Sequence, residues 1–327
     1  MHPISLTDSF GRSHTYLRIS LTDACNLRCL YCMPEEDTLV TPHAKLMQPA
    51  EIEGIASDFI KLGIRKIRLT GGEPLVRKDA GEIMKRLSAL GAELSISTNA
   101  VLAHEYLERF KETGIQKVNV SLDTLDPEQF KAITRRGDFE RILKNIYLLL
   151  EHNFEVKVNM VVMKGINEQA VCQFVAWTQK YRLDVRFIEF MPFSGNAWNR
   201  DKVYSSADML DQIGRQFEYK KLEDGVHDTA KKYKVEGYAG TFAFISTITE
   251  PFCGGCNRLR LTADGKLKNC LFSAGETDLL GPWRAGEDII PLILSTVWGK
   301  KKERGGRFDP DSYRENSENR SMIRIGG

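Results

Sequence analysis

The feature that most constrains the fold is an alternation of strand-like and helix-like segments between residues 16 and 189. Strands and helices that alternate at this spacing form right-handed crossover units around a parallel sheet. Six units fall short of the eight that close a standard barrel. The sequence therefore predicts an open α/β fold, with a doubly wound sheet as one alternative. The strand-like segments are 16–20, 66–70, 93–97, 117–121, 156–162 and 185–189, and the helix-like segments are about 50–62, 79–90, 104–113, 139–152 and 167–181.

The pattern changes after about residue 216, where shorter strand-like segments at 217–221, 233–236 and 241–248 lie between turns rich in glycine and charge. This change predicts two domains, 1–216 and 217–327, the second a smaller α+β region. The basic stretch 300–307 is predicted to be a solvated loop.

Composition excludes several classes of function. With 42% hydrophobic residues, 28% charged residues and a net charge of +2, the chain is typical of a globular protein, and nothing argues for binding to nucleic acid or an acidic membrane. No segment resembles a secretion signal or approaches membrane-spanning length. We therefore expect a cytoplasmic protein, in which seven cysteines favour metal binding or catalysis over disulfides.

Three cysteines follow the first strand-like segment, Cys25, Cys29 and Cys32. An odd group of three cannot pair internally, and a chain of 327 residues builds a core without disulfides. Structural zinc usually shows two separated ligand pairs, and no histidine lies in this loop. Three thiolates suit a four-iron, four-sulfur cluster that leaves one iron open to a small molecule. Zinc and buried thiols remain alternatives.

A second group of three cysteines lies near the C-terminus. Cys253 and Cys256 form a CxxC motif, and Cys270 follows after thirteen intervening residues. A CxxC motif alone is compatible with redox or zinc chemistry, but its repetition in a chain with the first group favours a second cluster. Cys172 lies alone in an apolar segment and is predicted to be a core residue.

The motif Cx3CxYC, with Tyr31 before its last cysteine, resembles the signature of the radical S-adenosylmethionine (SAM) superfamily. The whole pattern is similar to the GTP 3′,8-cyclase family, also called molybdenum cofactor biosynthesis protein A. The superfamily implies a partial (β/α)6 TIM-like barrel of the radical SAM type, and we expect the smaller C-terminal α+β region to pack against its open side. The matching segments are 8–12, 25–34, 68–74, 120–123, 186–191, 251–272 and 326–327.

The resemblance implies an enzyme, a lyase, with two 4Fe-4S clusters and SAM. A 5′-deoxyadenosyl radical would remove the hydrogen at GTP C3′, and the C3′ radical would attack C8 to form 3′,8-cyclo-7,8-dihydro-GTP, the first step of molybdopterin biosynthesis. The expected partners are GTP, an external electron donor and a downstream cyclic pyranopterin monophosphate synthase. We expect a monomer or homodimer.

The family's site residues carry over as follows. Cys25, Cys29 and Cys32 would bind the first cluster, and Cys253, Cys256 and Cys270 the second. The catalytic set is the first three cysteines together with Gly326 and Gly327, a diglycine tail that enters the active site. SAM would contact Tyr31, Gly72, Ser121 and Met191. GTP would contact Arg18, Lys66, Arg68, Thr98, Lys157, Arg258 and Arg260.

Each of these residues also has an ordinary interpretation. A lone strand cation is as often a solvated residue or a structural ion pair, and Gly71 and Gly72 are by themselves a turn signal. Arg18 and Arg68 alternate with apolar neighbours, so each should share a face distinct from them. Several cations that converge inside a barrel need an anion, and arginine fits phosphate well. Ala100 stands where the family commonly has glycine.

Two further functions remain open: a peptide-modifying radical SAM maturase with an auxiliary cluster, and a non-catalytic iron–sulfur carrier or zinc-binding module.

Overall fold

The computed structural model describes residues 5–33, 40–307 and 319–326. Its core is a twelve-stranded sheet in the order β12-β11-β10-β1-β2-β3-β4-β5-β6-β9-β8-β7. The strands are β1 Tyr16–Ser20, β2 Lys66–Thr70, β3 Glu93–Thr98, β4 Lys117–Ser121, β5 Glu155–Val162, β6 Asp184–Glu189, β7 Tyr219–Lys221, β8 Lys231–Val235, β9 Thr241–Ile245, β10 Arg258–Leu261, β11 Lys266–Lys268 and β12 Thr277–Asp278. The helices are α1 Pro49–Lys61, α2 Ala80–Ser88, α3 Leu107–Glu112, α4 Pro127–Thr134, α5 Phe139–Glu151, α6 Val171–Trp177, α7 Ser206–Gly214, α8 Leu280–Arg284, α9 Ile290–Trp298 and α10 Met322–Ile325.

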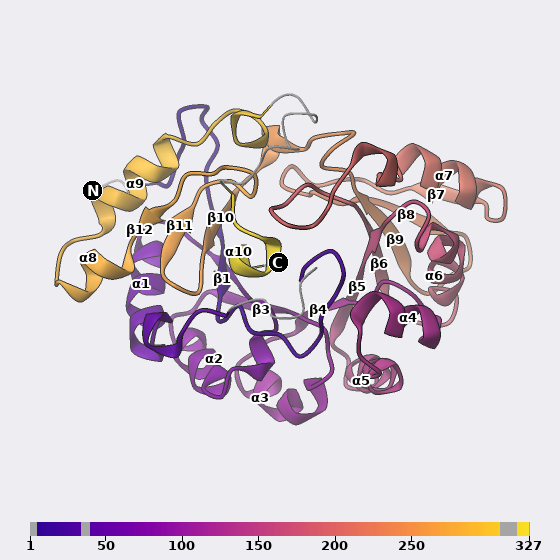
Figure 1. Ribbon diagram of the computed structural model, residues 1–327, viewed down its shortest axis with the longest axis horizontal. Helices are drawn as coiled ribbons and strands as arrows, with labels where there is room; N and C mark the ends of the chain where they lie inside the picture. Colours follow the sequence, from indigo (N-terminus) through magenta and orange to yellow (C-terminus); the bar gives the residue numbers. More distant parts are fainter. Residues whose placement is uncertain (1–4, 34–39, 308–318, 327) are drawn as a thin grey trace.

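Strands β1 to β6 are parallel and lie in chain order. The sheet curves without closing, with helices α1 to α6 along its outer side and the short α10 in its concavity (Figure 1). A doubly wound sheet would reverse its strand order and carry helices on both faces, so that alternative is wrong. The predicted partial (β/α)6 barrel is confirmed.

The C-terminal region continues the same sheet at both ends. β10 adds in parallel to β1, and β9 adds in parallel to β6. Each of these strands carries an antiparallel extension, β11–β12 on one side and β8–β7 on the other. The segments predicted after residue 216 thus correspond to β7, β8 and β9, whereas β11 and β12 are missing from the prediction.

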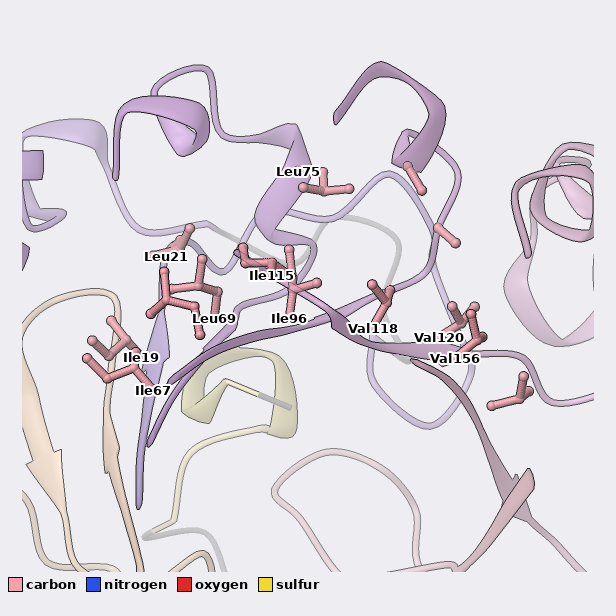
Figure 2. Close-up of a cluster of buried hydrophobic side chains, with 14 of the residues drawn as sticks. Ile19, Leu21, Ile67, Leu69, Leu75, Ile96, Ile115, Val118, Val120 and Val156 are labelled. Atoms are coloured by element: carbon pink, nitrogen blue, oxygen red, sulfur yellow. The ribbon is translucent and has the colours of Figure 1, made fainter. Parts of the chain in front are cut away.

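Side-chain alternation along the strands separates the core from the concave face. On β1, Leu17 and Ile19 are fully buried, and Arg18 between them points to the other side of the sheet. Figure 2 shows the apolar set, in which Ile19, Leu69 and Ile96 occupy directly paired positions on β1, β2 and β3. Because one face of each strand is apolar and the other polar, the register of the sheet is fixed by burial.

Helix α4 is missing from the predicted set, although its start carries a standard signal. Asp126 accepts a hydrogen bond from the Gln129 amide at 2.7 Å, and Pro127 occupies the first turn. The helix ends at Arg135, which adopts a left-handed backbone with φ of 56°. α4 matters for the site because its last turn supports the first cysteine loop.

Candidate active site

A cavity of about 470 Å³ opens on the concave face of the sheet. Both cysteine groups line it, although more than 200 residues separate them in the chain. All the predicted SAM and GTP contacts line it as well: Arg18, Tyr31, Lys66, Arg68, Gly72, Thr98, Ser121, Lys157, Met191, Arg258 and Arg260. The fold therefore gathers every predicted binding residue around one space.

The first cysteine group lies in the loop after β1, where α4 supports it. The amides of Arg28 and Leu30 donate to the carbonyls of Thr134 and Ile133, each at 3.0 Å. Burial, followed by the charge of Glu73, raises the pKa of the Cys25 thiol to about 11. Burial and the neighbouring Cys32 raise the pKa of Cys29 well above its ordinary value.

Tyr31 is hydrogen-bonded to a carboxylate that the sequence analysis did not assign to the site. Its hydroxyl donates to Asp123 at 2.7 Å, and Asp123 also accepts from the Val161 amide at 2.8 Å. Burial raises the pKa of Asp123 to about 6. The position of Asp123 just after β4, at the carboxyl edge of a parallel sheet, was the available signal for a site residue.

The Gly71–Gly72 turn packs directly against the start of the cysteine loop. The amide of Gly72 donates to the Thr22 carbonyl at 2.6 Å, and a Cβ at Gly72 would lie 2.4 Å from the Ala24 carbonyl oxygen. Any side chain would push the two backbones apart, so this position needs glycine for close approach.

Glu73, the residue after this turn, is a second buried carboxylate that the sequence analysis did not assign. It accepts hydrogen bonds from the Leu75 amide at 3.0 Å, the Thr98 hydroxyl at 2.8 Å and the Asn99 amide at 2.6 Å. Burial outweighs these bonds and raises its pKa to about 7. The Thr98 hydroxyl therefore donates to Glu73.

Ala100, two residues after Thr98, adopts a left-handed backbone with φ of 62°, the conformation for which glycine is favoured.

The second cysteine group lies on a tight turn that leads into β10. The Cys256 amide donates to the Cys253 carbonyl at 3.2 Å and closes the turn. Burial acts to raise the pKa of the Cys256 thiol, but the charge of Lys300 and a backbone hydrogen bond bring it below its ordinary value. At Cys253 burial prevails and raises the pKa.

The cysteines fit iron–sulfur ligation by the chemistry of their donors. All six thiols are free and line the cavity. Sulfur atoms in both groups accept hydrogen bonds from backbone amides. The Leu27 amide donates to Cys25 at 3.4 Å, and the Arg304 amide donates to Cys253 at 3.4 Å. In the described ranges, no three His, Cys, Asp or Glu side chains are gathered to hold a single metal ion.

Cations form rows across adjacent strands of the concave face. Arg260, Arg18 and Arg68 occupy directly paired positions on β10, β1 and β2. Burial, followed by the charge of Arg258, lowers the pKa of Arg260 to about 10. Burial, followed by the charge of Arg260, lowers the pKa of Arg18 well below its ordinary value. These buried guanidinium groups repel one another, so the cavity favours an anion.

The cationic surface continues on β5 and β6. Burial and the neighbouring Arg186 lower the pKa of Lys157 to about 8. Arg186 lies in the cavity wall and pairs with Asp184 at 2.7 Å. The sequence analysis missed Arg186 as a site residue, although strand alternation was an available signal. Lys66 differs from the buried cations. Its side chain is 49% exposed, and its ammonium nitrogen lies 3.2 Å from a carboxylate oxygen of Glu93.

Two amides and the C-terminal tail complete the surroundings. The side-chain oxygens of Asn119 and Asn159 are buried in the cavity wall without a hydrogen-bond partner in the described part of the chain. The carbonyl of Gly326 accepts a hydrogen bond from Arg260 at 2.6 Å. Gly327 lies outside the described residues.

One prediction away from the cavity is confirmed. Cys172 is buried in α6 as a core residue. None of the helices in the described ranges is long and apolar enough to cross a membrane.

Comparison with protein-family models divides the chain in two. Residues 19–178 match the radical SAM superfamily, and residues 183–306 match Molybdenum Cofactor Synthesis C. Among solved structures, SuiB of Streptococcus suis bound to S-adenosylmethionine superposes with a TM-score of 0.61 over 95% of this chain and 77% of that chain, at 15% identity. At that identity the likeness speaks for the fold alone.

Curated relatives match the whole chain. The mitochondrial GTP 3′,8-cyclase of Arabidopsis thaliana is 45% identical over 335 residues, which cover 100% of this chain and 85% of the relative. The GTP 3′,8-cyclase of Peptoclostridium acidaminophilum is 42% identical and covers 98% of both chains. Molybdenum cofactor biosynthesis protein 1 of Mus musculus is 46% identical over 98% of this chain, which spans only 51% of that relative. The chain therefore belongs to the radical SAM superfamily and, within it, to the family of GTP 3′,8-cyclases and molybdenum cofactor biosynthesis proteins.

Proposed function

We propose that this chain is a GTP 3′,8-cyclase that performs the first step of molybdenum cofactor biosynthesis. The observation that carries the proposal is the cavity, which two cysteine groups and a row of buried cations line together. A radical maturase that acts on a peptide has no need for that charge, whereas a triphosphate offsets it.

Cys25, Cys29 and Cys32 would hold a four-iron cluster, and Cys253, Cys256 and Cys270 a second one. When bound, the first cluster and SAM supply a 5′-deoxyadenosyl radical. A bound GTP would give its C3′ hydrogen to that radical and would form a bond between C3′ and guanine C8. One further electron and one proton complete 3′,8-cyclo-7,8-dihydro-GTP.

The chain's own residues would bind and orient the two small molecules. Arg18, Arg68, Lys157 and Arg260, with Lys66 and Arg258, would neutralise the triphosphate, and the cavity wall adds Arg186 to this set. Tyr31, Gly72, Ser121 and Met191 would contact SAM. Thr98 would border GTP with its hydroxyl held by Glu73. Gly326 would approach the substrate beside Arg260, and Gly327 would belong to the same catalytic tail.

The protein's surroundings in the cell complete the proposal. An external reductant supplies the electrons, a cyclic pyranopterin monophosphate synthase consumes the product, and the enzyme works in the cytoplasm as a monomer or homodimer.

The test uses the chain reconstituted anaerobically with iron and sulfide. It should bind about eight irons, as two four-iron clusters require. With SAM, reductant and GTP deuterated at C3′, it should release 5′-deoxyadenosine that carries the label. Arg258→Ala and Arg260→Ala should abolish GTP binding, while the exposed Arg215→Ala should leave it intact. Release of unlabelled 5′-deoxyadenosine, or none, would sink the proposal.

A further inference from the structure

Lys300 contradicts the prediction that residues 300–307 form a solvated loop. Lys300 is only 3% exposed, whereas its neighbours Lys301 and Lys302 are exposed. A buried ammonium group is costly unless it has strong acceptors. The position of Lys300 therefore calls for a specific acceptor near it.

The acceptors of Lys300 belong to the second cysteine group and its strand. Its ammonium nitrogen donates to the sulfur of Cys256 at 3.4 Å and to the carbonyl of Arg258 at 2.9 Å. Four residues further along, the backbone amide of Arg304 donates to the sulfur of Cys253 at 3.4 Å. One short loop thus directs an N–H donor at each of two thiols.

This loop is held in place by the N-terminal segment 8–12, which the proposed reaction leaves without a role. The guanidinium of Arg12 donates to the carbonyls of Lys301 at 2.8 Å, Lys302 at 2.7 Å and Cys253 at 2.9 Å. Asp8 fixes this guanidinium from behind, with its carboxylate 2.6 Å from Nε. Both side chains are nearly buried, at 10% and 0% exposure, so the contact is shielded from water.

Gly305 secures the other end of the loop. Its φ is 66°, and a Cβ there would lie 2.8 Å from the Ser273 amide nitrogen, in the segment that follows Cys270. Only glycine combines this backbone with so close an approach. The loop is therefore seated against the segments of all three cysteines of the second group.

We infer that Lys300 is a positioning residue for the second cluster, presented to Cys256 by a loop that Arg12 holds, and that it raises the reduction potential of that cluster. The inference rests on the proposed function for the second cluster itself. Hydrogen bonds to cluster sulfurs and nearby positive charge stabilise the reduced, more negative state. The Lys300 ammonium supplies both at one ligand.

The test measures the midpoint potential of the second cluster by EPR-monitored redox titration of the reconstituted chain. Cys25→Ala, Cys29→Ala and Cys32→Ala together remove the signal of the first cluster. In this background Lys300→Met should shift the potential to more negative values, and Lys300→Arg, which keeps a positive charge, should return it most of the way to the wild-type value. The matched control Lys301→Met, which removes an exposed ammonium one residue away, should leave the potential unchanged.

Arg12→Met gives a second measurement, because it frees the loop without altering Lys300 and should shift the potential in the same direction. A potential that stays at the wild-type value in both Lys300→Met and Arg12→Met overturns the inference, and a fold check by circular dichroism accompanies each variant. Failure of the proposed function looks different: the unmodified chain would then release no labelled 5′-deoxyadenosine from GTP deuterated at C3′, and a missing second cluster would show as about four irons in place of about eight.

Discussion

At the scale of single residues, two buried carboxyl groups lie near the first cysteine group. Glu73 and Asp123 both accept hydrogen bonds from backbone amides and from a side-chain hydroxyl. Burial raises the pKa of Glu73 to about 7 and that of Asp123 to about 6. Sequence reasoning found the glycines before Glu73 and the serine before Asp123 but neither carboxylate, because burial is not visible in a motif.

The raised pKa of Glu73 predicts a pH-dependent stability of the metal-free chain. Between the ordinary value of 4.5 and about 7, the folded state binds more protons than the unfolded state, so stability falls as pH rises through this window. Glu73→Gln removes this dependence. The free energy of unfolding of wild type relative to Glu73→Gln should therefore be larger at pH 4.5 than at pH 8, by roughly 3 kcal/mol.

Urea unfolding of both proteins at the two pH values measures this difference. The matched control is Glu105→Gln, whose side chain is 57% exposed, and it should show little change with pH. A difference between wild type and Glu73→Gln that stays constant with pH would contradict the burial of an ionisable Glu73.

At the scale of elements, β10 and α10 carry C-terminal residues to the N-terminal half of the cavity. β10 pairs with β1, so Arg258 faces Tyr16 and Arg260 faces Arg18 across the ladder. α10 buries Ile323 and Ile325 and leaves Gly326 against Ser20 and Thr70. The sequence indicated strand-like surroundings for Arg258 and Arg260, but pairing over such a separation is decided only by tertiary packing.

Gly326 is predicted to be intolerant of a side chain. Its φ is 86°, and a Cβ would lie 2.8 Å from both Ser20 Cβ and Thr70 Oγ1. An alanine at such a positive φ alone costs about 1–2 kcal/mol, a factor of about 5–30, so Gly326→Ala should weaken docking of the tail at least about fivefold. We expect faster proteolysis of the C-terminal segment and a similar loss of 5′-deoxyadenosine release with GTP.

The control is Gly275→Ala, because a Cβ there meets nothing within 4 Å. Gly275→Ala should match the wild type in proteolysis and in 5′-deoxyadenosine release. The iron content of Gly326→Ala should equal that of the wild type. Wild-type proteolysis and turnover in Gly326→Ala would show that the tail tolerates a methyl group.

At the scale of the whole molecule, an almost neutral chain concentrates positive charge in one cavity. The net charge is only +2, yet Arg18, Arg68, Arg258 and Arg260 lie together and burial lowers the pKa of each. Their repulsion reduces the stability of the empty cavity. An anion that binds there should therefore stabilise the entire fold.

Tripolyphosphate, which carries the charge of GTP without its nucleoside, should raise the melting temperature, and guanosine should not. At a ligand concentration one hundred times Kd the stabilisation is about 2.7 kcal/mol. Arg68→Met should reduce the shift, and Arg215→Met, which removes a guanidinium that is 74% exposed, should preserve it. Differential scanning calorimetry measures the melting temperature with each ligand. Equal shifts with guanosine and tripolyphosphate would contradict an anion site.

The sequence by itself determined the open parallel sheet and both cysteine groups. These follow from local information, because strand alternation repeats with a period of two and thiol spacing is read directly along the chain. Tertiary structure alone decided what meets in the cavity. In the folded chain β10 pairs with β1, and the buried Lys300 donates to the sulfur of Cys256. Arg12 holds the loop of Lys300 by hydrogen bonds to its backbone carbonyls. Such contacts depend on burial and long-range packing, which local sequence patterns do not record.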